Sequence, residues 1–214
     1  MERITLVLLT VFLDSDIDFT GETLEPIGVS DSNYFNGTFD GQGHAISNLN
    51  VTSSSGYVGL FGYSRGLTIT NVVLDSSCSI ISSYKGSFYA FVGGIIGECI
   101  ADFGLCAIEN SVNMGSVTFD GDISGYLYLG GISGYLSSYD YSSTVKNCAN
   151  YGGITHFGQN RNAYIGGIVG DFFGSSSIKS TSTTPSTTAQ SRTMAQHRMI
   201  CTLEDFRMDL SHNH

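Results

Sequence analysis

A glycine-bracketed apolar tetrapeptide recurs along the chain at nearly constant spacing, and it constrains the fold more than any other feature. The copies begin 35, 37 and 36 residues apart, at Gly59, Gly94, Gly131 and Gly167, and they occupy residues 59–62, 94–97, 131–134 and 167–170. An apolar-x-Asn triplet follows each of the first three boxes and ends at Asn71, Asn110 or Asn147. A period of this length predicts a stack of similar structural units.

Each repeat contains short apolar runs separated by Gly, Asn or Ser, such as residues 57–61, 68–74 and 115–119. A helical repeat needs long stretches with apolar residues every three to four positions and without glycine, and the sequence has none. We therefore predict an all-β solenoid in which one repeat forms one coil and strands stack about 4.8 Å apart. The three asparagines would form a ladder of side-chain amides, and the glycines would permit positive φ at corners and close approach of the coils.

The boxes and the segment IENSVNMGSVT (residues 108–118) resemble the GLUG-motif repeats of large secreted and surface adhesin-like proteins. The segment FNGTFDGQGHAISNL (residues 35–49) resembles a lead-in that is often found beside such repeats. The resemblance covers roughly residues 11–174 and implies a right-handed parallel β-helix. It also implies a fragment of a longer extracellular or cell-surface protein, with a non-enzymatic binding or structural role, no cofactor, and a surface protein or carbohydrate as partner.

A carbohydrate-active parallel β-helix enzyme, either a polysaccharide hydrolase or a lyase, is the alternative from another class. The position of the carboxylates discriminates the two, because an enzyme needs several that converge and a scaffold scatters them. Asp40 and His44 are the only acid and histidine placed together, and a turn-stabilising Asp40 is favoured over catalysis. The sequence has no nucleophile elbow and no H-E-x-x-H motif.

Charge and hydropathy exclude some partners. The 214 residues hold 19 acids and 9 bases, a net charge of −10, which argues against binding nucleic acid. The apolar run at residues 6–13 is too short to span a bilayer, so we expect no membrane insertion within this chain. Because no small-residue cleavage site follows this run, a first strand is favoured over a signal peptide.

The composition changes near Gly174. All 27 Gly and all 12 Tyr lie in residues 1–174, which we expect to form the solenoid, and none lies in the Ser/Thr-rich residues 175–214. We expect this tail to be disordered, or at most to form a short helix around residues 202–210. Reading its codons one base out of frame, with permitted synonymous choices, converts residues 186–206 into a string that matches residues 150–168. The match favours a frameshift, in the gene or in its sequencing, over an evolved tail.

Cysteines and acids are the main candidates for chemistry. Cys99 and Cys106 lie in one excursion between a box and the next strand, so a local disulfide fits a secreted protein, with buried free thiols as the alternative. No CxxC pair is present, which argues against structural zinc. Three acids alternate along a predicted strand and are candidate Ca²⁺ ligands, although a solvated outer face is favoured: Asp14, Asp16 and Asp18.

Two further residue types carry weaker signals. Asn36 and Asn50 begin N-x-T sequons, which are acceptors for N-glycosylation in a secreted protein. Several tyrosines are candidates for a carbohydrate- or protein-binding platform, although ordinary strand packing is favoured for most of them: Tyr126, Tyr128, Tyr135, Tyr139 and Tyr141.

Overall fold

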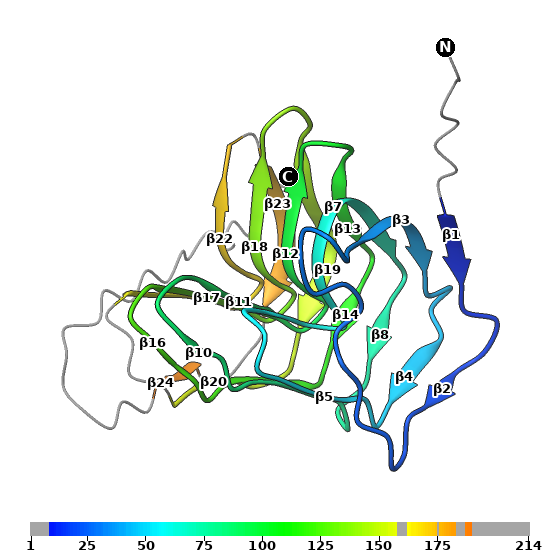
Figure 1. The fold of residues 1–214 in the computed structure, drawn as a ribbon. Helices are drawn as coiled ribbons and strands as arrows, with labels where there is room; N and C mark the ends of the chain where they lie inside the picture. The colour runs from blue at the N-terminus through cyan, green and yellow to red at the C-terminus, as the bar shows by residue number, and fades with distance from the viewer. Residues whose placement is uncertain (1–8, 158–161, 175, 183–186, 190–214) are drawn as a thin grey trace, which may run out of the picture.

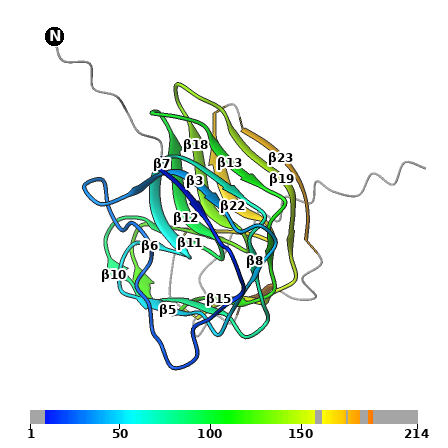
Figure 2. The same cartoon turned by 90° about the vertical axis from the view of Figure 1, so that its right-hand side faces the viewer.

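The computed structural model describes residues 9–157, 162–174, 176–182 and 187–189, and every regular element in these ranges is a β-strand. The strands form parallel sheets whose coils stack along one axis, so the prediction of an all-β parallel solenoid is confirmed (Figures 1 and 2). One row of paired positions has spacings of 35, 37 and 36 residues and runs through Phe61, Ile96, Ser133 and Val169.

The largest sheet contains thirteen strands, and each coil contributes several successive strands to it. The thirteen strands are β1 (Leu9–Phe12), β2 (Ile17–Asp18), β3 (Phe35–Asp40), β4 (Ala45–Ser47), β7 (Phe61–Thr70), β8 (Val73–Leu74), β12 (Ile96–Ala101), β13 (Cys106–Glu109), β14 (Val112–Asn113), β18 (Ser133–Ser138), β19 (Ser143–Asn150), β22 (Val169–Phe173) and β23 (Ser176–Ser182). One coil, for example, contributes β12, β13 and β14.

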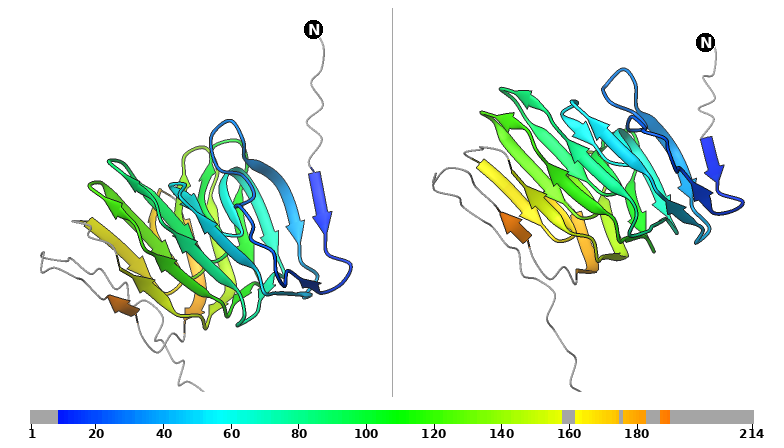
Figure 3. Two further views of the ribbon diagram at one scale, coloured as in Figure 1. Left: turned by 60° about the horizontal axis from the view of Figure 1, so that its bottom comes forward. Right: turned by 90° about the horizontal axis from the view of Figure 1, so that it is seen from below.

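The three smaller sheets complete each coil. The five-stranded sheet contains β5 (Asn50–Ser53), β9 (Ser79–Ser82), β15 (Ser116–Phe119), β20 (Ile154–His156) and β24 (Thr187–Ala189). The four-stranded sheet contains β6 (Tyr57–Val58), β11 (Ala90–Gly93), β17 (Tyr126–Gly130) and β21 (Asn162–Gly166). The two-stranded sheet contains β10 (Lys85–Gly86) and β16 (Asp122–Ile123). Figure 3 shows the coils following one another in chain order.

The interior is filled by apolar ladders, one for each long sheet. Side chains of a strand alternate between its two faces, so an apolar residue at every second position points inward in every coil. Parallel register then places equivalent residues of successive coils side by side, and all of these are buried. The ladders are Phe39–Ile69–Ile108–Val145, Val51–Ile80–Val117–Ile154 and Val58–Val92–Leu129–Ile165.

Asparagines and glycines at the corners have different roles. Asn71, Asn110 and Asn147 adopt left-handed φ angles of 55°, 50° and 53°, which asparagine tolerates better than most residues. Among the glycines, Gly28, Gly43 and Gly66 also adopt positive φ, whereas the box glycines do not. They allow close approach instead: a Cβ at Gly131 would overlap the Asn150 side chain and a carbonyl of the next coil.

The first strand lies where the apolar run predicts it. β1 covers Leu9–Phe12 and pairs in parallel with β3, while residues 6–8 lie outside the described residues. The predicted strand over residues 14–19 is interrupted, because a bend at Asp14 and Ser15 separates β1 from the short β2.

Strand pairing continues beyond Gly174, the boundary suggested by composition. β23 pairs with β19, and β24 pairs with β20, both in parallel. The register places Ser182 beside Asn150, whereas the out-of-frame reading assigns residue 186 to that position. The frameshift stays a prediction, and residues 190–214, including the expected helix at 202–210, lie outside the described residues.

Candidate functional site: the aromatic corner

Figure 1 shows the four-stranded sheet, with β11 and β17, meeting the large sheet near β12 and β18. Aromatic side chains of the two sheets pack together there, beside the glycine boxes. In the four-stranded sheet they alternate with the inward-facing ladder residues, so they project from the opposite face. We call this surface the aromatic corner. Its rings are Tyr57, Tyr63, Tyr89, Phe91, Tyr126, Tyr128, Tyr135 and Tyr164.

One row of these rings is stacked from coil to coil. Ring centroids lie 5.5 Å apart for Tyr57 and Phe91, 5.2 Å for Phe91 and Tyr128, and 5.1 Å for Tyr128 and Tyr164. The ring planes of each pair lie within 10° of parallel, which is an offset-stacked arrangement. Because neighbouring rings cover each other's faces, ring edges and phenolic hydroxyls remain for a ligand to reach.

Rings of the large sheet close the corner from the other side. Tyr63 packs on Tyr57 with centroids 5.0 Å apart, and Tyr135 packs on Tyr128 at 4.8 Å and on Phe91 at 5.5 Å. Burial raises the pKa of Tyr57 and of Tyr135 to about 12. These phenols therefore stay neutral and can both donate and accept hydrogen bonds.

Glu98 lies between two of the large-sheet rings, Tyr63 and Tyr135. It follows the second box directly and pairs in register with Tyr63 on one side and Tyr135 on the other. Its side chain is buried, with the residue only 7% exposed, and no hydrogen bond or ion pair joins it to the described residues. Burial, with a smaller contribution from the charge of Asp31, raises the pKa of Glu98 from 4.5 to about 8. The carboxyl is therefore neutral at pH 7 and is a hydrogen-bond donor.

Two further acids lie along the corner, Asp31 near Glu98 and Asp171 beyond Tyr135. Asp31, in the loop before β3, accepts a 2.7 Å hydrogen bond from the Tyr63 hydroxyl. Asp171 pairs in register with Tyr135 and so continues the row by one coil. The residues that directly follow the four boxes are thus Tyr63, Glu98, Tyr135 and Asp171. This position is visible in the sequence, but the sequence reasoning did not single out Glu98.

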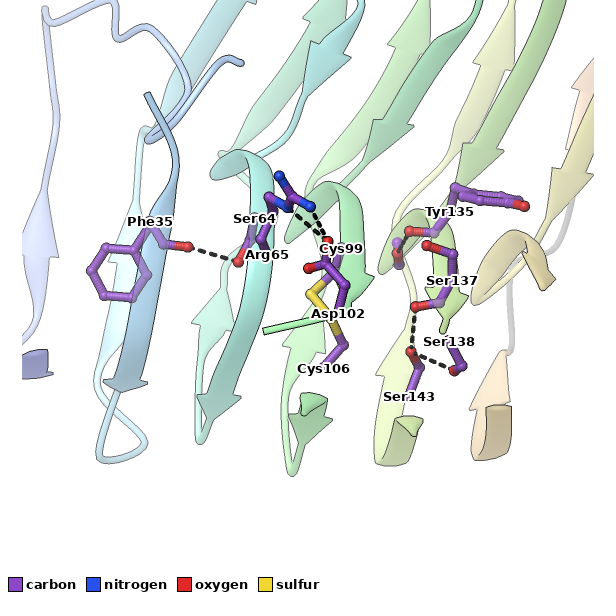
Figure 4. Close-up of a disulfide and its surroundings, with 11 residues drawn as sticks. Phe35, Ser64, Arg65, Cys99, Asp102, Cys106, Tyr135, Ser137, Ser138 and Ser143 are labelled. Atoms are coloured by element: carbon purple, nitrogen blue, oxygen red, sulfur yellow. Dashed lines mark hydrogen bonds and ion pairs between the residues drawn. A yellow bond between two sulfur atoms is a disulfide. The ribbon is translucent and has the colours of Figure 1, made fainter. Parts of the chain in front are cut away.

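The nearby cation Arg65 already has partners. Its guanidinium forms an ion pair with Asp102 (Figure 4). The guanidinium also lies 3.6 Å from an Asp31 oxygen and 4.3 Å from the Phe103 ring centroid. The hydrogen bond to Asp102 raises the pKa of Arg65 further. Arg65 therefore offers little unpaired charge to an anionic ligand.

Cys99 and Cys106 form a disulfide between β12 and β13, behind the corner (Figure 4). Cys78 and Cys148 are buried and lie outside this disulfide. Burial raises the pKa of Cys78, so its thiol is unreactive at neutral pH.

The three N-terminal aspartates do not form a common site. The Ala45 backbone N–H and the His44 ring hold the pKa of Asp16 below its usual value. Hydrogen bonds from Thr20 and Asn48 do the same for Asp18, and Asp14 lies in the bend before β2. Within the described ranges, no group of three His, Cys, Asp or Glu side chains is arranged to hold a metal ion.

Asp40 and His44 lie four positions apart in the sequence but have different partners. Asp40 accepts 2.9 Å hydrogen bonds from the Gln42 backbone N–H and the Asn71 side-chain amide. His44 lies 3.2 Å from Asp16 instead. Asp40 therefore stabilises the turn, and the two residues do not form the acid–histidine pair of a catalytic site.

The asparagines form two ladders. Asn147 donates a 3.1 Å hydrogen bond to Asn110, while Asn71 is bonded to Asp40 rather than to Asn110. A second, buried ladder was missed: the Asn113 amide donates to the Gly131 carbonyl at 2.9 Å and to the Asn150 side chain at 3.0 Å. The parallel Asn-x-Gly tripeptides at residues 113–115 and 150–152 are the signal that could have revealed it.

The remaining candidates are dispersed over the surface. Asn36 is half-buried in β3, and Asn50 is exposed at the start of β5. Of the singled-out tyrosines, three belong to the aromatic corner, whereas Tyr139 and Tyr141 are exposed in the loop after β18. The Tyr139 ring packs against Phe173 with centroids 5.8 Å apart.

Comparison with known proteins gives no match to a family model, a curated protein or a solved structure. Among the described residues, no helix has the length and apolar character that a membrane span requires. The residues of the aromatic corner therefore carry the functional argument.

Proposed function

We propose that this chain is a non-enzymatic binding module of an extracellular or cell-surface protein, with GLUG-like repeats, and that it contacts a surface glycan or protein through the aromatic corner. The observation that carries the proposal is the continuous aromatic row on the outer face of the solenoid. Solenoids use such extended faces for binding, because each coil adds an equivalent position. The Cys99–Cys106 disulfide supports an oxidising compartment.

The exposed fraction of each ring in the aromatic corner separates a binding role from a purely structural one. Stacking between coils accounts for the half-buried rings, but Tyr89 and Tyr126 are 49% and 38% exposed. Exposed aromatic side chains that adjoin a row of half-buried rings are characteristic of interaction surfaces. Tyr89 and Tyr126 are therefore the residues whose removal should affect binding more than folding.

A binding comparison tests this proposal. The full chain is applied to immobilised glycans and to surface-protein extracts, together with a variant that carries Tyr89→Ala and Tyr126→Ala. Tyr151→Ala is the matched control, because Tyr151 is 53% exposed and lies outside the corner. We expect the double variant to lose binding and the control to retain it. Equal binding by all three proteins would contradict the role of the corner.

A carbohydrate-active enzyme is the second candidate, and one observation favours it. Glu98 lies near a second acid, Asp31, and its pKa is raised from 4.5 to about 8 by burial and by the charge of Asp31. A buried glutamic acid with a raised pKa has the property of a general acid. Incubation with neutral and acidic polysaccharides, followed by assay of new reducing ends and unsaturated products, tests this activity. Turnover that disappears in Glu98→Gln would establish the enzyme and overturn the non-enzymatic role.

A further inference from the structure

We propose that the ligand of the aromatic corner is a neutral glycan chain lying along the solenoid axis, and that the Glu98 carboxyl donates a hydrogen bond to one of its oxygens. This inference rests on the proposed binding function and specifies its ligand and its central contact. Three features of the corner lead to it: its repetition, its polar groups and its charge.

The repetition favours a linear polymer. Tyr57, Phe91, Tyr128 and Tyr164 occupy one register position in successive coils, so the corner presents similar groups at regular intervals along the axis. A chain of repeating sugar units can meet one such group in coil after coil. A folded protein partner has no corresponding repeat.

The polar groups favour a partner rich in hydroxyls. The corner combines aromatic edges with phenolic hydroxyls and one buried carboxyl, that of Glu98, and sugar hydroxyls both donate and accept hydrogen bonds. Glu98 is more than nine-tenths buried, lies between the rings of Tyr63 and Tyr135, and has no partner among the described residues. Its carboxyl oxygens are not among the fully enclosed unpaired atoms of the described residues, which are Asp102 Oδ1 and Ser137 Oγ, so they keep an opening to solvent through which a ligand oxygen can reach them and replace water.

The charge excludes anionic glycans. Asp31 lies close enough to Glu98 to raise its pKa, Asp171 lies beyond Tyr135 in the same row, and Arg65 is already paired with Asp102 and Asp31. The whole chain carries a net charge of −10. Uronic-acid and sulfated chains are therefore repelled, whereas an uncharged chain is not.

The donor role of Glu98 makes binding depend on pH. The titratable groups that face Glu98 are Asp31 from the loop before β3, Tyr57 from β6, Tyr63 from β7 and Tyr135 from β18. Burial raises the pKa of each of these three phenols to about 12 or above, so they stay protonated when Glu98 ionises near pH 8. Above that pH, Glu98 has no proton to donate, and a second negative charge lies beside Asp31.

The test measures affinity of the full chain for neutral glucan, mannan, xylan and galactan oligosaccharides, with polygalacturonate as the anionic comparison. Titrations are made about two pH units below and above the Glu98 pKa of about 8. We expect binding of at least one neutral series at the lower pH, no binding of polygalacturonate, and about tenfold weaker binding at the higher pH. This pH comparison on the unchanged protein does not depend on whether a variant folds.

Variants at Glu98 identify the donor. Glu98→Gln keeps a side-chain donor and should bind at both pH values, whereas Glu98→Leu should bind about tenfold more weakly at both. Stronger binding of polygalacturonate, or capture of a surface protein in place of any glycan, overturns the ligand class. Glycan binding that needs Tyr89 and Tyr126 but is unchanged by pH and by Glu98→Leu overturns the inference and leaves the binding function standing. Absence of glycan and protein binding in every condition overturns both.

Discussion

The interior and the outer corner of the solenoid are both built from ladders, but only the outer ladder changes chemical character along its length. Inside, Phe39, Ile69, Ile108 and Val145 follow one another without a polar residue. Outside, the positions after the boxes alternate between rings and acids, and Glu98 is buried there without a partner. The fold needs side chains of suitable size at each position. A residue that weakens the stack, as Glu98 does, indicates a requirement other than folding.

The largest change in the free energy of unfolding should come from Glu98→Gln, because this substitution removes the titration of Glu98. Burial raises the pKa of Glu98 from 4.5 to about 8, so the unfolded chain loses this proton at lower pH than the folded chain. The free energy of unfolding therefore falls by about 1.4 kcal/mol for each pH unit between these values, roughly 5 kcal/mol in all. Glu98→Gln should be less sensitive to pH over this interval and more stable than the wild type at pH 8. Chemical denaturation at a series of pH values measures the difference, and parallel curves for the two proteins would show an ordinary surface carboxylate.

Truncation of a side chain in the interior ladder should lower the free energy of unfolding strongly at any pH. Ile108 is fully buried between Ile69 and Val145, so Ile108→Ala leaves a cavity and should lower the free energy of unfolding by about 3 kcal/mol. Urea denaturation checks this value, with exposed Tyr151→Ala as the control. A loss below about 1 kcal/mol would mean that the interior is not close-packed at this position.

The disulfide should contribute somewhat less than the Ile108 side chain to the free energy of unfolding. Cys99 and Cys106 close a short loop with a sequence separation of 7, for which loop-closure entropy gives about 2.5 kcal/mol. A variant with Ser at both positions should unfold at lower denaturant concentration, and mass spectrometry of the alkylated wild type should show these two thiols protected. Labelling of both cysteines in the unreduced protein would contradict the pairing.

The exposed rings should change stability least and binding most. Tyr126→Ala removes a ring that is 38% exposed and should lower the free energy of unfolding by only about 0.5 kcal/mol. Its binding to the partner of the aromatic corner should fall about tenfold or more. If stability falls as far as in Ile108→Ala while binding is unchanged, the rings serve the stack alone.

The repeat in the sequence predicts the solenoid because its spacing appears again as the register between coils, as in the row from Phe61 to Val169. It does not divide the roles of the corner residues, since positive φ falls on the asparagines and on glycines outside the boxes, and close packing on the box glycines. The turn role of Asp40 could be predicted, whereas the pairing of His44 with Asp16 joins residues 28 positions apart and could not be read from the local sequence.

The aromatic corner was only partly predictable. Tyrosines such as Tyr128 and Tyr135 are conspicuous in the sequence, but their meeting depends on the angle between two sheets. The burial of Glu98 depends on rings contributed by three coils: Tyr63, Phe91 and Tyr135. A single repeat does not contain that information.

The protonation state of Glu98 tests the central claim most directly, because the claim is that the corner holds a buried, neutral carboxyl. Carbon-13 NMR of the side-chain carboxyl, assigned by its absence in Glu98→Gln, measures the titration without requiring a ligand. The structure predicts a midpoint near pH 8. A midpoint near the ordinary value of 4.5 would show that Glu98 is solvated and charged at neutral pH, and it would contradict the aromatic corner described above.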